Sequence, residues 1–297
     1  MLLIVILIYN IIQMCGIYGI TENNPSLIRT MIDKCSHRGP NGSDIYSNDK
    51  LTLGHNLLSI TSDVKSGKQP WISDRGNVLI YNGELFNYKD LLIKFKNKFF
   101  PKTTCDTELL SWLLDEFPYE KIVGDLIDSM HSFVFFNYKN NEIVLSRDHV
   151  GIKPLFFANT KSGIIFSSEI KGLLDYTQNS NKIDRISLVC TGMLGINVLR
   201  QTVFNGIYKV FPGETIIFDL ENKKIKKTFR TLIKPYSNKK FKSEEFANIT
   251  AKTIENSTLG IRKFGIFLSG GLDSSLIAYE LNKHIDNLNS FTNKMYP

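Results

Sequence analysis

The feature that most constrains the fold lies near the end of the chain, where an apolar strand, a glycine turn and a helix follow one another directly. Phe264 to Leu268 predicts a buried strand, Asp273 to His284 predicts a helix, and Leu288 to Thr292 predicts the next strand. This order is a βαβ unit, whose two strands are parallel. Ser243 to Ser257 adds a preceding helix, so we expect the last part of the chain to begin an α/β domain.

The turn of this unit has the composition of a phosphate-binding loop. Its residues are Ser269-Gly270-Gly271-Leu272-Asp273-Ser274-Ser275, directly after Leu268. Glycines let the backbone approach a phosphate, and the amides at the start of the helix face the anion. The serine hydroxyls add donors, and Asp273 is a candidate ligand for Mg²⁺. No Gly-Lys-Ser/Thr follows, so the loop is not a Walker P-loop. The alternative is a serine-capped helix after a glycine turn.

The earlier residues predict many strands and a smaller group of helices, which is typical of sheets covered by helices. The expected strands are 17–20, 51–60, 78–81, 133–138, 142–146, 155–158, 164–167, 214–219 and 226–230, the last two as a hairpin. The expected helices are 89–98, 107–116, 119–127 and one that Ser26 caps and that ends near Cys35. Between them, Asn82-Gly83 is a dipeptide that favours turns.

The net charge of +7 at pH 7 has two local sources, Lys223 to Lys227 and Lys239 to Lys242. We interpret both as solvated surface, because no basic motif interleaved with aromatic residues accompanies them, and we expect no nucleic-acid partner. The four cysteines form no CxxC pair and no zinc-binding spacing; they are Cys15, Cys35, Cys105 and Cys190. This pattern predicts reduced thiols in a cytoplasmic protein.

Met14-Cys15 is a second motif with a chemical meaning. When a methionine before a cysteine is removed, one residue carries both a nucleophilic thiol and a basic α-amine. The preceding segment Met1 to Ile12 is strongly apolar, but it is shorter than the roughly 20 residues that span a bilayer and lacks the features of a secretory signal. We therefore expect no membrane partner. We favour, in order, a true start at Met14, a propeptide that is removed, and a hydrophobic anchor.

The loop Ser269 to Ser275 resembles the pyrophosphate loop of the ATP pyrophosphatases, and an ordered set of earlier motifs resembles the glutamine-hydrolysing asparagine synthetases. The motifs are Cys15-Gly16-Ile17, His37-Arg38-Gly39-Pro40, Leu58-Ser59-Ile60, Gln69-Pro70, Asn82-Gly83-Glu84, Asp106-Thr107-Glu108, Arg147 to Leu155 and Ser168-Glu169-Ile170-Lys171. Each motif alone is unspecific, but the ordered set over residues 14–297 is specific. The resemblance implies an α/β protein: an N-terminal-nucleophile (Ntn) hydrolase αββα sandwich followed by the start of an adenine-nucleotide α/β domain.

The resemblance also implies a division into domains and a set of substrates. Residues 1–14 would be a leader that is absent or removed, 15–220 a class II glutamine amidotransferase domain, 221–240 a linker, and 241–297 an incomplete synthetase domain of the ATP pyrophosphatase type. Glutamine, aspartate and ATP with Mg²⁺ are the implied substrates, and no organic cofactor is expected. A homodimer and a separate C-terminal synthetase fragment are both candidate partners.

In the glutaminase part, the resemblance makes Cys15 the nucleophile that attacks the glutamine carboxamide. Its own α-amine would be the base, and an α-amine pKa of about 7.7–8.0 suits that task. The side-chain amide of Asn82 and the backbone N–H of Gly83 would form the oxyanion hole. With residues 1–14 attached, Cys15 has an amide nitrogen in place of the amine, and we expect no glutaminase activity.

The remaining roles concern substrate binding. Glu84 and Asp106 would bind the substrate ammonium, although Asp106 could also be only a helix N-cap. Leu58, Ser59 and Ile60 would line the glutamine pocket. The residues implied to hold ATP, while aspartate is adenylated, are Leu268, Ser269, Gly270, Gly271, Asp273, Ser274 and Ser275, with Asp273 on Mg²⁺.

Leu57 departs from the family, which has an arginine at this place that binds the glutamine carboxylate. Losing a bidentate partner costs about 1–3 kcal/mol. We therefore expect a raised KM for glutamine, with ammonia as an alternative donor, unless Arg38, Lys65 or Lys68 takes over.

Family synthetase domains also continue beyond the point where this chain stops, so glutaminase chemistry is the part that we expect to be complete. The rival interpretations are another class II amidotransferase, an inactive or regulatory remnant, and one subunit of a split synthetase.

Overall fold

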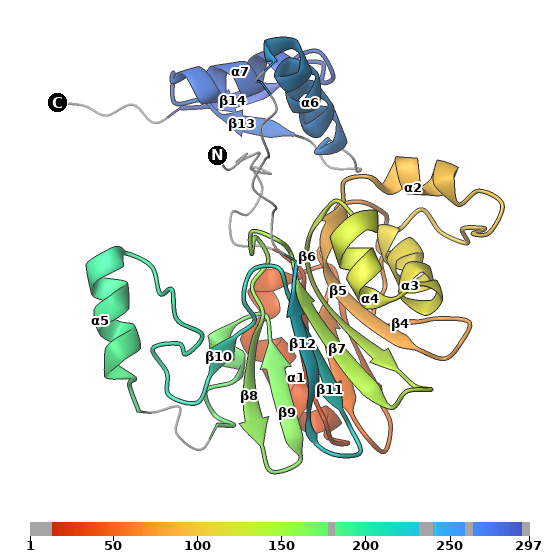
Figure 1. Ribbon diagram of the computed structural model, residues 1–297, viewed down its shortest axis with the longest axis vertical. Coiled ribbons are helices and arrows are strands. Elements are labelled where there is room, and N and C mark those ends of the chain that lie inside the picture. The colour runs from red at the N-terminus through yellow and green to blue at the C-terminus, as the bar shows by residue number, and fades with distance from the viewer. Residues whose placement is uncertain (1–13, 178–181, 232–239, 241, 259–263, 293–297) are drawn as a thin grey trace.

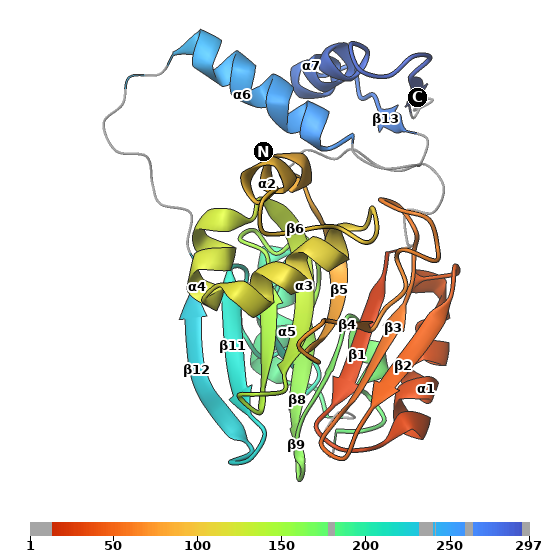
Figure 2. The same ribbon diagram turned by 90° about the vertical axis from the view of Figure 1, so that its right-hand side faces the viewer.

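Two six-stranded antiparallel sheets lie face to face in the main body of the protein (Figures 1 and 2). The computed structural model describes residues 14–177, 182–231, 240, 242–258 and 264–292. The strands of the first sheet are β1 (Gly16–Ile20), β2 (Ser43–Ser47), β3 (Thr52–Asn56), β8 (Phe156–Thr160), β9 (Gly163–Ser167) and β10 (Tyr208–Lys209). They lie in the order β10-β8-β9-β1-β3-β2, which places β1 next to the centre of the sheet.

The second sheet contains the longest strands of the chain. Its strands are β4 (Trp71–Ile72), β5 (Val78–Leu85), β6 (Ser129–Asn137), β7 (Glu142–Arg147), β11 (Glu214–Asp219) and β12 (Lys224–Arg230). They lie in the order β12-β11-β7-β6-β5-β4. The expected hairpin is formed by β11 and β12, in which Ile216 pairs with Thr228.

Apolar side chains of both sheets fill the space between them. Ile17 and Phe166 from the first sheet belong to the same buried cluster as Ile80 and Phe136 from the second. On β6, Phe136 faces this cluster while its neighbour Phe135 faces the opposite side, as the two-residue period of a strand requires. Burying side chains of this size contributes about 1.5–3 kcal/mol each, so this layer is a main source of stability.

Helices cover the outer face of each sheet (Figure 2). On the first sheet, α1 (Pro25–Lys34) and the short 3₁₀ helix η3 (Ile170–Gly172) pack over β1 and β9, and a further 3₁₀ helix, η1 (Ser36–Arg38), follows α1. The helices on the second sheet are α2 (Tyr88–Lys94), α3 (Asp106–Glu116), α4 (Tyr119–Lys121) and the π-helix η2 (Ile122–Leu126). The layers therefore follow the expected αββα order.

Two local expectations were wrong. Asn82 and Gly83 do not form a turn; they lie inside β5, where they pair with Ser132 and His131 of β6. Asn24, not Ser26, caps α1, because its side-chain oxygen accepts a hydrogen bond of 3.2 Å from the backbone N–H of Leu27. At Asn82-Gly83, the pairing of β5 with β6 overrides the turn preference of the dipeptide. At the start of α1, Pro25 fixes where the helix begins, so Asn24 is its cap.

One helix was not expected at all. Helix α5 (Arg185–Leu194) begins at Asp184, whose carboxylate accepts a hydrogen bond of 2.8 Å from Ser187 N, and ends at Gly195 with φ of +70°. Figure 1 shows it standing away from the sheets. Most of its apolar side chains are exposed. The helix therefore has no apolar face buried against the core, which is the feature that identifies a surface helix.

The end of the chain forms a small unit with α6 (Ser243–Asn256), β13 (Gly265–Phe267), α7 (Leu272–Leu281) and β14 (Asn289–Phe291). Strands β13 and β14 are parallel, with Ile266 opposite Ser290, as the βαβ pattern predicts. Ile254, Ile266 and Leu281 form its buried cluster.

Strand β12 occupies part of the segment 221–240 that we expected to be a linker. Residues 232–239 of that segment, and residues 1–13 of the expected leader, lie outside the described residues.

Candidate active site

Cys15 lies directly before β1, where the first sheet presents it to a pocket. Its thiol accepts a hydrogen bond of 3.3 Å from Leu58 N and donates one of 3.5 Å to Leu58 O. Burial raises the pKa of the Cys15 thiol, although the Leu58 contact and the cations Lys153 and Arg38 oppose this shift. A thiol with a raised pKa is a weak nucleophile at neutral pH, so the site needs a base beside Cys15.

The pocket has a volume of about 40 Å³ and brings together the residues predicted for glutamine chemistry. Those that line it are Cys15, Leu58, Ser59, Ile60, Asn82, Gly83, Glu84 and Asp106. They come from the start of β1, the loop after β3, strand β5 and the start of α3. Met14 also lines the pocket, so its removal would enlarge it.

Asn82 and Gly83 enter the pocket from β5, at a point where this strand is paired with β6. Asn82 is only 2% exposed, and its Nδ2 has no hydrogen-bond partner among the residues that the structure describes. A Cβ atom at Gly83 would lie 2.3 Å from Met130 O, so this position accepts glycine alone. The Asn82 amide is therefore a desolvated hydrogen-bond donor that is free to bind an acceptor in the pocket.

Glu84 and Asp106 supply two carboxylates to the same pocket. Asp106 is the first residue of α3, but its Oδ2 accepts a hydrogen bond of 3.0 Å from Leu85 N on β5. Burial, followed by the Asp106 carboxylate, raises the pKa of Glu84 to about 8, and burial also raises the pKa of Asp106. Glu84 Oε1 has no hydrogen-bond partner within the described part of the chain. A bound cation such as a substrate ammonium would stabilise the charged form of both buried acids.

The loop after β3 forms the wall that carries Leu57 and Ser59. Ser59 N donates a hydrogen bond of 2.9 Å to Asn41 Oδ1, and Leu57 N donates one of 2.8 Å to Gly42 O. Leu57 is 7% exposed and lines the pocket. The cations considered as substitutes for the missing arginine do not line it: Lys68 pairs with Asp44 at 2.8 Å and Lys65 is exposed.

Arg38 is the third of these cations. It uses Nε and Nη1 to hold the carbonyl oxygen of Cys15 and the carboxylate of Glu169, each at 3.0 Å. It therefore supports Cys15 from behind the pocket.

Sequence reasoning missed one cation of the pocket, Lys153. It belongs to the motif Arg147 to Leu155, which the sequence identified without assigning a role to any of its residues. Lys153 lines the pocket and is 7% exposed. The signal that could have located it is the arginine–aspartate pair at the start of the motif, since these side chains bind the loop backbone around Lys153.

The predicted phosphate loop has the expected local form. Gly270 has a φ of +79°, and Gly271 caps α7. The hydroxyls of Ser274 and Ser275 donate to Gly271 O at 3.1 and 2.9 Å, and Ser269 Oγ lies 3.0 Å from Ser274 Oγ.

Asp273 is exposed in the first turn of α7, and Leu268 ends the strand side of the loop, where its N–H donates to Phe291 O. No cluster of three metal-binding side chains occurs within the described ranges. A single carboxylate such as Asp273 suits a Mg²⁺ ion whose other ligands are substrate phosphates and water. It does not suit a site in which the protein supplies all of the ligands.

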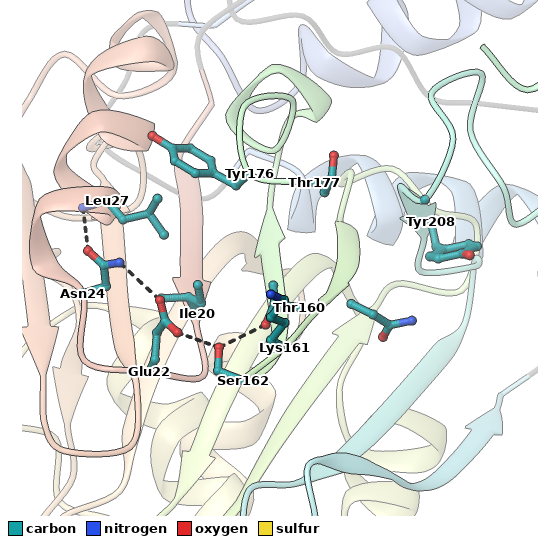
Figure 3. Close-up of a pocket in the computed structure, with 12 residues that line it drawn as sticks. Ile20, Glu22, Asn24, Leu27, Thr160, Lys161, Ser162, Tyr176, Thr177 and Tyr208 are labelled. Atoms are coloured by element: carbon teal, nitrogen blue, oxygen red, sulfur yellow. Dashed lines mark hydrogen bonds between the residues drawn. The ribbon is translucent and has the colours of Figure 1, made fainter. Parts of the chain in front are cut away.

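A wider pocket of about 590 Å³ lies elsewhere, between the start of α1 and the β8–β9 turn (Figure 3). Glu22 accepts hydrogen bonds from Asn24 Nδ2 at 3.2 Å and from Ser162 Oγ at 2.6 Å. Ser162 Oγ in turn lies 3.1 Å from Thr160 Oγ1. None of the predicted site residues lines this pocket, and Glu22, Asn24, Ser162 and Thr160 form a chain of hydrogen bonds along it, so we assign it no role.

Comparisons with known proteins match two parts of the chain to two families. Residues 14–230 match the family described as glutamine amidotransferase domain, and residues 245–296 match the family described as asparagine synthase. The putative asparagine synthetase (glutamine-hydrolyzing) 2 of Methanocaldococcus jannaschii is 30% identical over 92% of this chain and 58% of its own length. Asparagine synthetase (glutamine-hydrolyzing) 3 of Bacillus subtilis is 28% identical over 89% of this chain and 44% of its own. The chain thus spans about half the length of these relatives.

The fold is shared with a solved structure, the glutamine phosphoribosylpyrophosphate amidotransferase from B. subtilis complexed with ADP and GMP. The TM-score is 0.53 at 16% sequence identity, over 94% of this chain and 65% of that chain. This likeness confirms the expected Ntn-hydrolase sandwich. In the part of the chain that the structure describes, no helix is long and apolar enough to cross a membrane. Because the match covers residues 14–230, the chain belongs to the glutamine amidotransferase domain family, and residues 245–296 behind that domain match the asparagine synthase family.

Proposed function

We propose that this chain hydrolyses glutamine to glutamate and ammonia at Cys15. The observation that carries the proposal is the desolvated amide of Asn82, which lies in the pocket of the Cys15 thiol and whose Nδ2 has no hydrogen-bond partner among the described residues. A buried donor without a partner is costly, and a developing oxyanion would satisfy it. The buried acids Glu84 and Asp106 lie in the same pocket, where the ammonium of an amino-acid substrate would bind.

The reaction needs a base, and the α-amine of Cys15 is that base once residues 1–14 are absent. The amine takes the proton from Sγ as sulfur bonds to the carboxamide carbon, and the carbonyl oxygen becomes an oxyanion held by Asn82 Nδ2 and Gly83 N–H. The C–N bond then breaks, and the ammonium form of Cys15 returns the proton to the leaving nitrogen, which departs as ammonia. Water, activated by the same amine, hydrolyses the thioester and releases glutamate.

We further propose that residues 241–297 belong to a unit that uses ATP with Mg²⁺ to convert aspartate to asparagine with this ammonia. The glycine turn before α7 and the names of the relatives support this assignment. The loop Leu268 to Ser275 would bind the phosphates, with Asp273 on the metal ion. A second copy of the chain or a separate synthetase fragment would be the partner, and the free cysteines support a cytoplasmic location.

The test is an ammonia-release assay on a chain expressed from Met14, with the mature N-terminus determined by mass spectrometry. Cys15→Ala, Cys190→Ala and the full chain from Met1 are assayed in parallel. We expect glutamine-dependent release only from chains that begin at Cys15, and we expect Cys190→Ala to retain it. Release that survives in Cys15→Ala would reject the proposal, and absence of release from a folded chain with a free Cys15 would favour the inactive remnant.

A further inference from the structure

Lys153 is held in the pocket by a rigid backbone turn between β7 and β8. The Arg147 side chain donates to Lys153 O and Gly151 O at 2.7 Å and to Val210 O at 2.8 Å. The Asp148 carboxylate accepts from Ile152 N at 2.8 Å and from Lys153 N at 3.0 Å. With its backbone fixed on both sides, the Lys153 side chain has a defined direction into the site.

The ammonium of Lys153 points to the residue that precedes the nucleophile. Its Nζ lies 3.4 Å from Met14 Sδ, and it makes no salt bridge with any residue that the structure describes. Burial lowers the pKa of Lys153, and the Cys15 thiol and the Glu84 carboxylate, which act on it through space, oppose this shift and favour the ammonium form. A buried lysine without a paired carboxylate is uncommon, and this one lies at the reacting end of the pocket.

The other charged groups around Cys15 lie on η1, on β5, on α3 and in the loop after β9. Arg38, on η1, binds the carbonyl oxygen of Cys15 and the carboxylate of Glu169, which His37 also contacts at 2.8 Å. Glu84 on β5 and Asp106 on α3 face the pocket from the second sheet and its helix layer. Lys153 is therefore the cation whose position responds most directly to the removal of Met14.

We propose that Lys153 is a positioning residue whose ammonium comes to face the Cys15 α-amine when Met14 is removed and favours the uncharged, basic form of that amine. The inference rests on the proposed role of Cys15 as an N-terminal nucleophile. Two cations repel when they share a partly buried site, so protonation of the amine becomes harder. The enzyme gains a larger fraction of competent base at neutral and slightly acid pH.

The experiment measures the amine directly, so that it does not depend on turnover. Chains that begin at Cys15 and carry ¹³C-labelled cysteine are titrated by NMR from about pH 5 to about pH 9, a range that brackets the ordinary α-amine pKa. The variants are Lys153→Met, Lys153→Arg and, as a matched control, Lys65→Met on the exposed loop. We expect Lys153→Met to raise the amine pKa by about 0.5 to 1 unit, and the other two to leave it close to wild type. Lys153→Arg keeps the charge should Lys153→Met fold poorly, and Cys15→Ala identifies the Cys15 resonances.

The kinetic readout separates this inference from the proposed function. In Lys153→Met, the acid limb of the kcat/KM profile for glutamine should move to higher pH by the same amount. An unmoved titration with intact glutaminase activity, or a rise in KM alone, would overturn the role of Lys153 and leave the role of Cys15 standing. A moved titration in a chain without glutaminase activity would support Lys153 and reject the proposed function.

Discussion

The guanidinium of Arg38 donates a hydrogen bond of 3.0 Å from Nε to the carbonyl oxygen of Cys15. The same side chain lies 3.0 Å from Glu169 Oε1, so it links the start of β1 to the loop after β9. It is almost fully buried. Arg38 thus holds the backbone of Cys15, while Cys15 itself lines the pocket.

Replacing Arg38 by methionine should destabilise the protein and misplace the nucleophile. The change leaves the Cys15 carbonyl without its donor, which costs about 1–3 kcal/mol. Urea unfolding measures the stability, and kcat/KM for glutamine should fall in the folded fraction. Arg29→Met is the control, because Arg29 is exposed on the same layer and donates a hydrogen bond of 3.1 Å to Ser43 Oγ, away from Cys15. Equal stability of the two variants would show that the Cys15 contact is dispensable.

Replacing Asn82 by alanine should lower kcat for glutamine by about 100- to 1000-fold, the usual effect of losing one oxyanion donor, with little change in KM. Steady-state kinetics on a chain that begins at Cys15 measures both constants. Asn137→Ala is the control, since Asn137 Nδ2 donates to Tyr119 OH outside the pocket. A change confined to KM would assign Asn82 to substrate binding and contradict its place in the oxyanion hole.

Replacing Glu84 by glutamine should stabilise the ligand-free protein at mildly alkaline pH. Burial, followed by the Asp106 carboxylate, raises the pKa of Glu84 from 4.5 to about 8. The folded state therefore retains a proton that the unfolded chain loses, so this contribution to stability is complete below the unfolded pKa and is lost as the pH rises to about 8. Glutamine has no proton to lose, and the gain should reach about 1–3 kcal/mol at about pH 8.

Urea unfolding at about pH 5 and about pH 8 measures this difference, since these values lie near the two ends of the range in which the contribution is lost. The exposed Glu221 provides the control variant Glu221→Gln. The same Glu84 variant should also bind glutamine more weakly, because it lacks a negative charge for the substrate ammonium. A variant that is less stable than wild type at both pH values would show that the Glu84 carboxyl is not the group under strain.

Replacing Leu57 by arginine should lower the KM for glutamine by about 10-fold or more, the effect of one charge-assisted pair to a carboxylate. The pocket has no other arginine to bind that group among the residues that line it. Leu57→Met is the matched control for the loss of leucine packing, and circular dichroism monitors the fold. An unchanged KM in a folded Leu57→Arg protein would mean that the substrate carboxylate binds away from this wall.

Much of the architecture was predictable from the sequence because its strands and helices carry the periodic patterns of buried faces. The βαβ unit follows from apolar runs with turn residues between them, and the β11–β12 hairpin follows from two strand-like segments separated by Asn222 and Lys223. The order of the strands within each sheet did not follow from such patterns, since it depends on pairings between residues as distant in sequence as Tyr18 and Ser167. The αββα order of the layers, by contrast, was implied by the family resemblance.

The residues of the candidate site were predictable as a set, but their setting was not. Asn82-Gly83 was expected as a turn because the dipeptide dominates short hairpin loops, whereas pairing with β6 continues through it. Lys153 was missed because the sequence shows the Arg147-Asp148 pair but not that these two side chains bind the backbone around Lys153 and fix the direction of its side chain. Such contacts depend on the assembled tertiary structure.

The antiparallel register of β5 against β6 has a practical consequence for preparations of this protein. A slip of one residue would turn Asn82 toward the helix layer and remove its amide from the pocket. A molecule with the wrong pairing would therefore lack one oxyanion donor and hydrolyse glutamine far more slowly. Titrating the Cys15 thiol with a glutamine-like electrophile would count the correctly assembled molecules in a sample, and that count would correct every rate constant measured on it.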